Sequence, residues 1–186
     1  MKLTKKLEAE VLKVYNEIWD ANLRGDIRTF ASMLDENCHI IGSAAGEVFK
    51  NKKAAVKFYT ATADEIAGKA EMRNRKISVT LVDSGVIVNE ESDFYFLIDD
   101  QWTNYGHARI TCLFHKKNNK WKVIHMHNSF PDSKTEEGEQ VNADRIKAEN
   151  IQLRDAVKRR TEELESKNRE LEIETSTISL FRTPST

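Results

Sequence analysis

The chain has 186 residues, enough for one domain of ordinary size with an appendage. Its 29 Lys and Arg residues nearly balance its 30 Asp and Glu residues, which removes the general electrostatic case for binding nucleic acid or an anionic membrane. Two cysteines, Cys38 and Cys112, suit neither a disulfide framework nor a thiolate metal cage, and no apolar run reaches the roughly 18–20 residues that cross a bilayer. We therefore expect a cytoplasmic protein that needs no cofactor or metal and binds neither nucleic acid nor membrane.

Helical periodicity dominates the first part of the chain. Apolar side chains recur at steps of three and four over residues 3–24, which predicts a long amphipathic helix. Gly25 suits the C-terminal cap of this helix, and Asp26 can cap a second, short helix. Asn51 can cap a third helix, after a short strand over residues 38–41. The sequence therefore predicts the order helix, helix, short strand, helix before the longer strands begin.

After Gly68 the period of the apolar pattern changes to two. Ile77, Val79 and Leu81 alternate with polar residues, and turn sequences separate longer alternating runs further on. The expected strands lie around residues 77–81, 86–98, 102–115 and 121–130. Helices followed by an antiparallel meander make an α+β fold, in which one curved sheet wraps around the long helix and leaves a cavity at its open end.

The distribution of aromatic residues places the domain boundary. All three Trp, all four Tyr and seven of the eight Phe residues lie between Tyr15 and Phe130. The charged stretch that follows cannot bury enough apolar area to fold as a globule by itself. We expect a folded domain over residues 1–131, a linker over 132–140, a coiled-coil signalling helix over 141–174 and a disordered tail over 175–186.

The end of the meander resembles a known family. The segment from Phe114 to Ser129 combines a basic turn, Lys-Trp, an apolar pair and His-x-His, and it resembles the closing hairpin of SnoaL-like domains, which share a fold with nuclear transport factor two. The association domain of calmodulin-dependent kinase has a similar ending. The resemblance covers residues 5–130 and implies a cone-shaped, curved antiparallel sheet wrapped around three N-terminal helices. It implies no single activity, because this fold hosts isomerases, cyclases, dehydratases, assembly modules and ligand sensors.

The charged segment resembles the signalling helix that joins input domains to bacterial histidine kinases and cyclases, on the strength of residues 148–154 and 160–172. One stripe has spacings of 4, 3, 4, 4, 3, 4 and 3, and consists of Ile146, Asn150, Leu153, Val157, Thr161, Leu164, Asn168 and Leu171. The doubled four is a stutter, and the two asparagines favour a two-stranded coil with a defined register. We expect a parallel dimeric coil, and the alternative is a single solvated helix with salt bridges.

Two of the expected strands carry candidate binding residues. His125 and His127 are two apart, so they should point the same way as Trp121 and Val123. On the preceding strand, a polar side is formed by Tyr105, His107, Arg109 and Thr111. This side either lines a wet pocket for an anionic or hydroxylated ligand or faces a polar dimer interface. In the first case Arg109 is the natural partner of a carboxylate.

The complete set of expected ligand-binding residues is Tyr15, Trp19, His39, Trp102, Tyr105, His107, Arg109, His125 and His127. An enzyme of the isomerase kind would need a carboxylic base in an apolar pocket. Asp93, in the middle of a strand, is the only acid we would test for that role, because Asp35 and Asp99 are expected in turns.

The sequence thus favours a non-catalytic module that senses a small ligand of unknown identity. It is expected to form a homodimer through its sheet and its coiled coil, as the input half of a bacterial signalling protein. No glycine-rich nucleotide site is found, so the chain itself is not expected to be a kinase. Two alternatives stay open: an isomerase, cyclase or dehydratase acting on a small hydrophobic or acidic substrate, and an oligomerisation module without a ligand.

Overall fold

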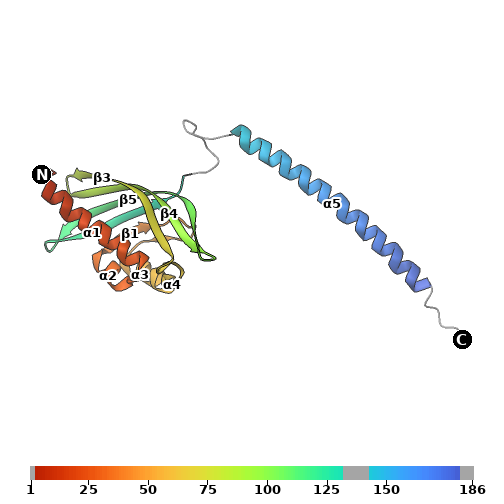
Figure 1. The fold of residues 1–186 in the computed structure, drawn as a ribbon, viewed down its shortest axis with the longest axis horizontal. Coiled ribbons are helices and arrows are strands. Elements are labelled where there is room, and N and C mark those ends of the chain that lie inside the picture. The colour runs from red at the N-terminus through yellow and green to blue at the C-terminus, as the bar shows by residue number, and fades with distance from the viewer. Residues whose placement is uncertain (1–2, 132–142, 181–186) are drawn as a thin grey trace. The chain divides into compact units, whose positions relative to one another are not determined.

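The computed structural model describes residues 3–131 and 143–180. The chain divides into two compact units, Met1–Pro131 and Asp132–Thr186. The elements of the first unit are α1 (Lys5–Leu23), α2 (Ile27–Met33), β1 (Leu34–Ile41), β2 (Val48–Phe49), α3 (Lys52–Ala61), α4 (Ala63–Ile66), β3 (Ala70–Val82), β4 (Gly85–Ile98), β5 (Gln101–Lys117) and β6 (Lys120–Ser129). Figure 1 shows α1 lying along the sheet, with α2, α3 and α4 gathered beside its C-terminal part.

The helices of this unit begin at the expected capping residues. Asp26 accepts a hydrogen bond of 3.0 Å from the backbone N–H of Thr29, and Asn51 accepts one of 2.9 Å from that of Ala54. Gly25 follows α1 with a φ of +73°, which a residue with a side chain rarely adopts. The predicted starts of α2 and α3 are therefore confirmed, whereas the short helix α4 was not expected.

The six strands form one curved sheet in the order β2-β1-β6-β5-β4-β3. The expected meander from β3 to β6 is antiparallel throughout, and the α+β cone fold is confirmed. β1 joins the meander as a parallel neighbour of β6, and it pairs on its other edge with the two-residue strand β2. The N-terminal helices cover the concave face, where Tyr15 of α1 meets the ring of Phe114 edge to face at 6.4 Å.

A β-bulge in β6 overturns one expectation about the two histidines. Val123 pairs with Phe114, but the next residue of β5, Leu113, pairs with His125, so that Ile124 is an extra residue. Side chains of β6 point alternately inward and outward. Before the bulge the inward, buried residues are Trp121 and Val123, and after the bulge the inward residue is Met126. His125 and His127 therefore lie on the outer, convex face of the sheet and do not share a face with Trp121 and Val123.

A second bulge, where β4 and β5 pair, separates residues that the sequence placed on one side. Phe94 pairs with Gly106 and Tyr95 pairs with Asn104, which leaves Tyr105 as the extra residue. Tyr105 consequently joins the aromatic side chains of the concave face. His107, Arg109 and Thr111 keep the alternation of the rest of β5 and lie on the convex face.

Asp35 lies in strand β1, and the expectation that it sits in a turn was wrong. It is only 4% exposed. Its carboxylate accepts hydrogen bonds from Lys117 Nζ at 2.7 Å and from the backbone N–H of Asn37 at 3.0 Å, and His115 Nε2 lies 3.0 Å from it. These partners, two of which are about eighty residues away in the chain, allow the carboxylate to be buried.

The described residues of the second unit form one helix, α5 (Ala143–Leu180). It continues beyond the expected end at residue 174, so the first part of the expected tail is helical. The expected linker over residues 132–140 lies outside the described residues. Side chains of the stripe are exposed along α5, from Ile146 at 37% to Leu153 at 64%. Among the described helices, none is long and apolar enough to cross a membrane.

Candidate functional site

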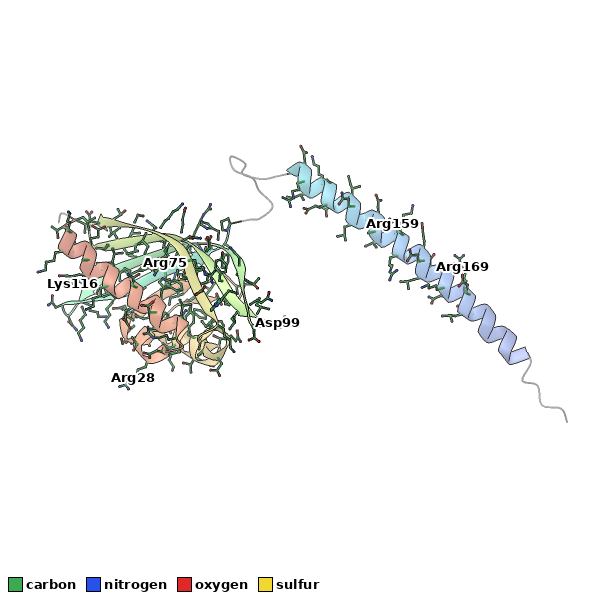
Figure 2. The ribbon with its side chains drawn as sticks, viewed as in Figure 1. Arg28, Arg75, Asp99, Lys116, Arg159 and Arg169 are labelled. Carbon is green, nitrogen blue, oxygen red and sulfur yellow. The ribbon has the colours of Figure 1, made fainter. Side chains whose placement is uncertain are left out.

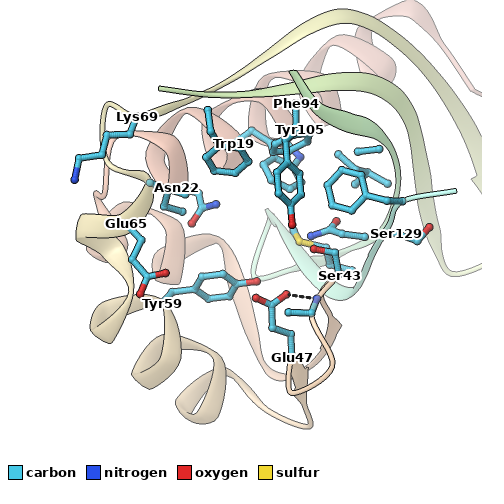
Figure 3. Close-up of a pocket in the computed structure, with 18 of the residues that line it drawn as sticks. Trp19, Asn22, Ser43, Glu47, Tyr59, Glu65, Lys69, Phe94, Tyr105 and Ser129 are labelled. Atoms are coloured by element: carbon cyan, nitrogen blue, oxygen red, sulfur yellow. Dashed lines mark hydrogen bonds between the residues drawn. The ribbon is translucent and has the colours of Figure 1, made fainter. Parts of the chain in front are cut away.

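A cavity of about 520 Å³ opens at one end of the cone. It lies between the concave face of the sheet and the helices, and a loop between β1 and β2 closes one side (Figure 3). The volume is within the range of about 300–1,000 Å³ that small-molecule sites occupy. The hollow expected at the open end of the sheet is therefore present, and it has the size of a ligand site.

Aromatic rings from α1, β4 and β5, together with Phe130 just after β6, build the apolar wall of this cavity. Trp19 meets Phe94 edge to face with ring centroids 6.0 Å apart, and Phe94 meets Phe130 at 6.1 Å. Tyr105 contacts Phe130 at 5.3 Å and Phe96 at 5.1 Å. These edge-to-face contacts continue from ring to ring, so the rings hold one another in place and keep the wall preformed.

Two polar atoms of residues that line the cavity have no partner within the described part of the chain. They are Oδ1 of Asn22 and Oδ1 of Asn128. Asn22 is only 7% exposed. A buried polar atom without a hydrogen bond lowers the stability of a fold, commonly by about 1–3 kcal/mol. Two residues of the cavity lining thus hold hydrogen-bond acceptors that no protein donor satisfies.

Glu47 and Tyr59 form the polar side of the cavity. Figure 3 shows the Tyr59 hydroxyl and the Glu47 carboxylate pointing toward one another. The loop holds both the backbone and the side chain of Glu47. Gly42 N–H donates a hydrogen bond of 2.7 Å to the Glu47 carbonyl, and Ala44 N–H donates one of 3.2 Å to Glu47 Oε2. Burial, and next the Glu47 carboxylate, raise the pKa of Tyr59, so its hydroxyl stays protonated.

Of the nine expected ligand-binding residues, Trp19 and Tyr105 line the cavity. Tyr15 is fully buried one turn before Trp19, with the guanidinium of Arg75 5.9 Å from its ring centroid. Burial, and then the nearby Cys112 and Glu90, raise the pKa of Tyr15. Tyr15 therefore belongs to the core behind the cavity wall.

Asp93, the candidate base, lies on the convex face of the sheet with His107. Asp93 Oδ1 lies 2.8 Å from His107 Nδ1, and Asp93 Oδ2 accepts a hydrogen bond of 2.8 Å from Asn74 Nδ2. The hydrogen bond from Asn74, followed by that from His107, lowers the pKa of Asp93. Arg109 pairs with Glu91 in the ladder on the same face. The structure does not bring Asp93, His107 or Arg109 to the cavity.

The remaining expected residues also lie outside the cavity lining. His39 and His125 are neighbours across the β1–β6 ladder with ring centroids 5.7 Å apart, and His127 pairs with Ile41 two residues further along. Partial burial, followed by the charges of His39 and His127, lowers the pKa of His125. Trp102 is exposed, and the guanidinium of Arg73 lies 5.9 Å from its ring centroid. Within the described residues, no cluster of His, Cys, Asp and Glu suits a metal ion.

Four polar residues of the cavity lining were not among the residues expected from the sequence: Asn22, Glu47, Tyr59 and Asn128. Asn22 was hidden in the pattern of α1, because its position follows the buried side of that helix. Asn128 could have been found only by placing the bulge in β6 correctly. The loop that carries Glu47 has no periodicity that would indicate the direction of a side chain.

Solved structures with the same fold have several kinds of function. A protein of unknown function with a cystatin-like fold from Nostoc punctiforme is 14% identical, with a TM-score of 0.60 over 72% of this chain and 97% of its own. A proposed calcium/calmodulin dependent protein kinase II association domain from Xanthomonas campestris is 16% identical, with a TM-score of 0.55 over 70% and 91%. A proposed dehydratase of the NTF2-like family from Streptomyces avermitilis is 14% identical, with a TM-score of 0.56 over 66% and 95%. At these identities the likeness shows the fold alone.

The match to a family is more specific than the likeness to these structures. No curated protein matches the chain. The profile of the SnoaL-like domain matches residues 11–133, which include most of α1, the whole sheet and the walls of the cavity. The chain therefore belongs to the SnoaL-like domain family.

Proposed function

We propose that residues 1–131 bind one small, mainly apolar molecule in the cavity, and that this unit is the input module of a signalling protein. The observation that carries the binding role is the pair of side-chain oxygens, on Asn22 and Asn128, that line the cavity without a protein partner. A ligand with a matching donor would remove the penalty of leaving them unsatisfied.

A direct test of binding uses the neutral fluorescent probe N-phenyl-1-naphthylamine with the full-length protein. Ala44 is exposed and lines the mouth of the cavity, so Ala44→Trp should block entry and reduce probe binding at least tenfold while the fold stays intact. Ala45 is the next residue of the same loop, is also exposed and does not line the cavity. Ala45→Trp is therefore the matched control. Equal binding by both variants would contradict a site in this cavity.

The signalling role is supported by the properties of α5. Its apolar stripe is exposed along the described part of the helix, and such a stripe gains stability mainly by packing against another chain. In a parallel, in-register pair, oppositely charged flanking residues would meet across the interface: Glu149 and Arg154, Arg160 and Glu165, and Lys167 and Glu172 of the second copy. These pairs favour the parallel dimeric coil that the sequence predicts.

We propose that the homodimer forms through the sheet as well as through α5. Its convex face carries partly buried Leu113, together with charges of both signs such as Arg109 and Glu91. A two-fold axis can place each charge of such a surface against its opposite on the second copy. Light scattering on the full-length protein and on a form that ends at Asp132 separates the two surfaces. The shorter form stays dimeric if the sheet suffices, and it becomes monomeric if the coil alone holds the dimer.

For the input role, the ligand must favour one of two arrangements of the dimer. Disulfide cross-linking along α5, with and without a bound molecule, measures this directly. A change in the cross-linked positions near the stutter at Val157 supports signalling. An identical pattern in both states contradicts it, while leaving the binding role intact.

An enzyme is the second candidate, and the arrangement of Glu47 and Tyr59 favours it. A carboxylate and a protonated hydroxyl at one cavity wall are the base and the acid of a proton-transfer reaction. For this candidate Glu47 replaces Asp93 as the residue to test. Loss of turnover of an enolisable ketone in Glu47→Gln, with unchanged turnover in Asp93→Asn, would establish the enzyme over the sensor.

A further inference from the structure

The charges around the cavity are predominantly acidic. Glu47 and Glu65 line it, and the one cationic residue among the described lining residues is Lys69. Lys69 is exposed, and its Nζ already donates a hydrogen bond of 2.8 Å to the carbonyl of Asp64. A carboxylate-bearing ligand would therefore meet more repulsion than attraction at this site.

The cations expected to bind an acid are on the other side of the sheet. Arg109 and His107 are on the convex face, as are His125 and His127. The sheet backbone and its core side chains separate them from the cavity, which the concave face lines. The expectation that Arg109 binds a carboxylate in the pocket therefore does not apply to this cavity.

Two further acidic residues lie at the open end of the cone. β4 ends at Ile98, which lines the cavity, and Asp99 and Asp100 form the turn that follows. Figure 2 shows Asp99 at this end of the sheet and Lys116 at the opposite end. A negative potential at an entrance raises the local concentration of cations and the rate at which they enter.

The interior of the cavity provides acceptors and aromatic faces. Oδ1 of Asn22 and Oδ1 of Asn128 accept no hydrogen bond from the described residues, and the Glu47 carboxylate accepts one from Ala44 N–H through Oε2. The rings of Trp19, Phe94 and Phe130 contribute an apolar wall whose faces also attract cations. A ligand that fits both the aromatic wall and the acceptors has an aromatic or aliphatic ring system and a hydrogen-bond donor group at one end.

We infer that the cavity takes an apolar amine, whose protonated nitrogen is bound by the Glu47 carboxylate and whose ring body packs on the aromatic wall. This inference rests on the proposed binding function and adds the chemical class of the ligand. The Glu47 carboxylate is oriented by Ala44 N–H, so it is in place before the ligand arrives. The cavity volume of about 520 Å³ accommodates a fused two-ring system with a short side chain.

The test compares three probes with one ring body: 2-naphthylmethylamine, 2-naphthylmethanol and 2-naphthoate. Calorimetry on the full-length protein at pH 7 should give an amine that binds about tenfold more tightly than the alcohol, because a hydrogen bond to a charged group is the stronger one. The carboxylate should bind more weakly than the alcohol. Glu47→Gln should remove the difference between amine and alcohol while leaving the affinity for the alcohol within about twofold.

Two control variants make the result specific to Glu47. Glu36→Gln removes the same charge from β1, outside the cavity lining, and should keep the preference for the amine. Glu65→Gln removes the other acid of the lining, and it should reduce the preference by less than Glu47→Gln does. If Glu65→Gln abolished the preference and Glu47→Gln did not, the assignment of Glu47 would be overturned.

The outcomes also separate this inference from the function on which it rests. If the alcohol binds and the amine binds no better, or if the carboxylate binds best, the ligand class is wrong and the cavity is still a binding site. If none of the three probes nor N-phenyl-1-naphthylamine binds, the binding function itself is wrong. If the amine is preferred and Glu47→Gln removes the preference, both are supported.

Discussion

Arg75 holds Glu90 with two hydrogen bonds beneath α1. Arg75 Nε lies 2.7 Å from Glu90 Oε1, and Arg75 Nη2 lies 2.8 Å from Glu90 Oε2. Glu90 is only 2% exposed, so the guanidinium is the group that allows a carboxylate to lie in the core behind the cavity.

Arg75→Ala should therefore destabilise the protein by about 3–5 kcal/mol, because it leaves the Glu90 carboxylate buried without its partner. The measurement is chemical denaturation at pH 7, followed by tryptophan fluorescence. Arg73→Ala is the control, since Arg73 pairs with Glu71 at the surface and its loss should change the free energy of unfolding by about 1 kcal/mol or less. Equal effects of the two substitutions would contradict the structural role of the buried pair.

Asp35 should make the stability of the fold depend on pH in the acid range. Hydrogen bonds from Lys117 and from Asn37 N–H, followed by that of His115, hold the pKa of Asp35 well below its ordinary value. Its carboxylate thus stabilises the fold above the unfolded-state pKa of about 4, and this contribution declines as the pH falls through the folded-state pKa.

At pH 7 Asp35→Asn should lower the free energy of unfolding by about 1.5–3 kcal/mol, because hydrogen bonds to a charged group are lost. The difference between the wild type and Asp35→Asn should shrink when denaturation is repeated at successively lower pH below about 4. A difference that stays constant over this range would show that the carboxylate contributes no charge-dependent stability.

Gly42 leaves room for the side chain of Glu47. A Cβ added at Gly42 would lie 1.9 Å from Glu47 Oε2 and 2.7 Å from Glu47 Cβ, so Gly42→Ala must displace Glu47. It should weaken binding of 2-naphthylmethylamine about as much as Glu47→Gln does. A Cβ at Gly46, in the same loop, would meet nothing within 4 Å, and Gly46→Ala should bind the amine like the wild type. Unchanged binding by Gly42→Ala would argue against Glu47 as the anchor.

Gly106 supports the cavity wall at the bulge in β5. Its φ is +157°, and an added Cβ would lie 3.2 Å from Cδ1 of Phe130. Gly106→Ala should lower the free energy of unfolding by about 1–3 kcal/mol through backbone strain, and it should move Phe130 within the wall. Thermal unfolding measures the first effect, and affinity for N-phenyl-1-naphthylamine measures the second. A variant as stable as the wild type, with the same affinity, would show that the bulge tolerates a side chain.

Disulfide cross-linking of single-cysteine variants of the full-length protein tests how two copies of α5 pair. In a parallel, in-register coil, Leu153→Cys and Leu164→Cys should each form a disulfide-linked dimer on mild oxidation, because each residue faces its own copy. Asp155→Cys, off the stripe, is the control and should cross-link much less. Since Cys38 and Cys112 are buried, the wild type should give little background. Cross-linking at Asp155→Cys as strong as at the stripe would contradict the coil.

The order of the longer helices and strands could be predicted from the sequence, because local signals control them, whereas the short elements β2 and α4 were not expected. Asp26 and Asn51 cap their helices with side chains three residues from the N–H groups they satisfy. The change from a period of about three and a half to a period of two marks the start of the strands. The distribution of aromatic residues separates the part of the chain with a core from the part without one, and the closing hairpin carries the resemblance to the family.

Which residues face the cavity depends on how the strands pair, and this could not be predicted from the sequence. One extra residue in a strand reverses the direction of every side chain beyond it, so the bulges at Tyr105 and Ile124 moved Tyr105 into the cavity and His125 to the convex face. The direction of Glu47 depends on hydrogen bonds within an irregular loop, and the burial of Asp35 depends on Lys117, far along the chain. Such relationships arise from how strands pair and pack, and no local pattern of residues records them.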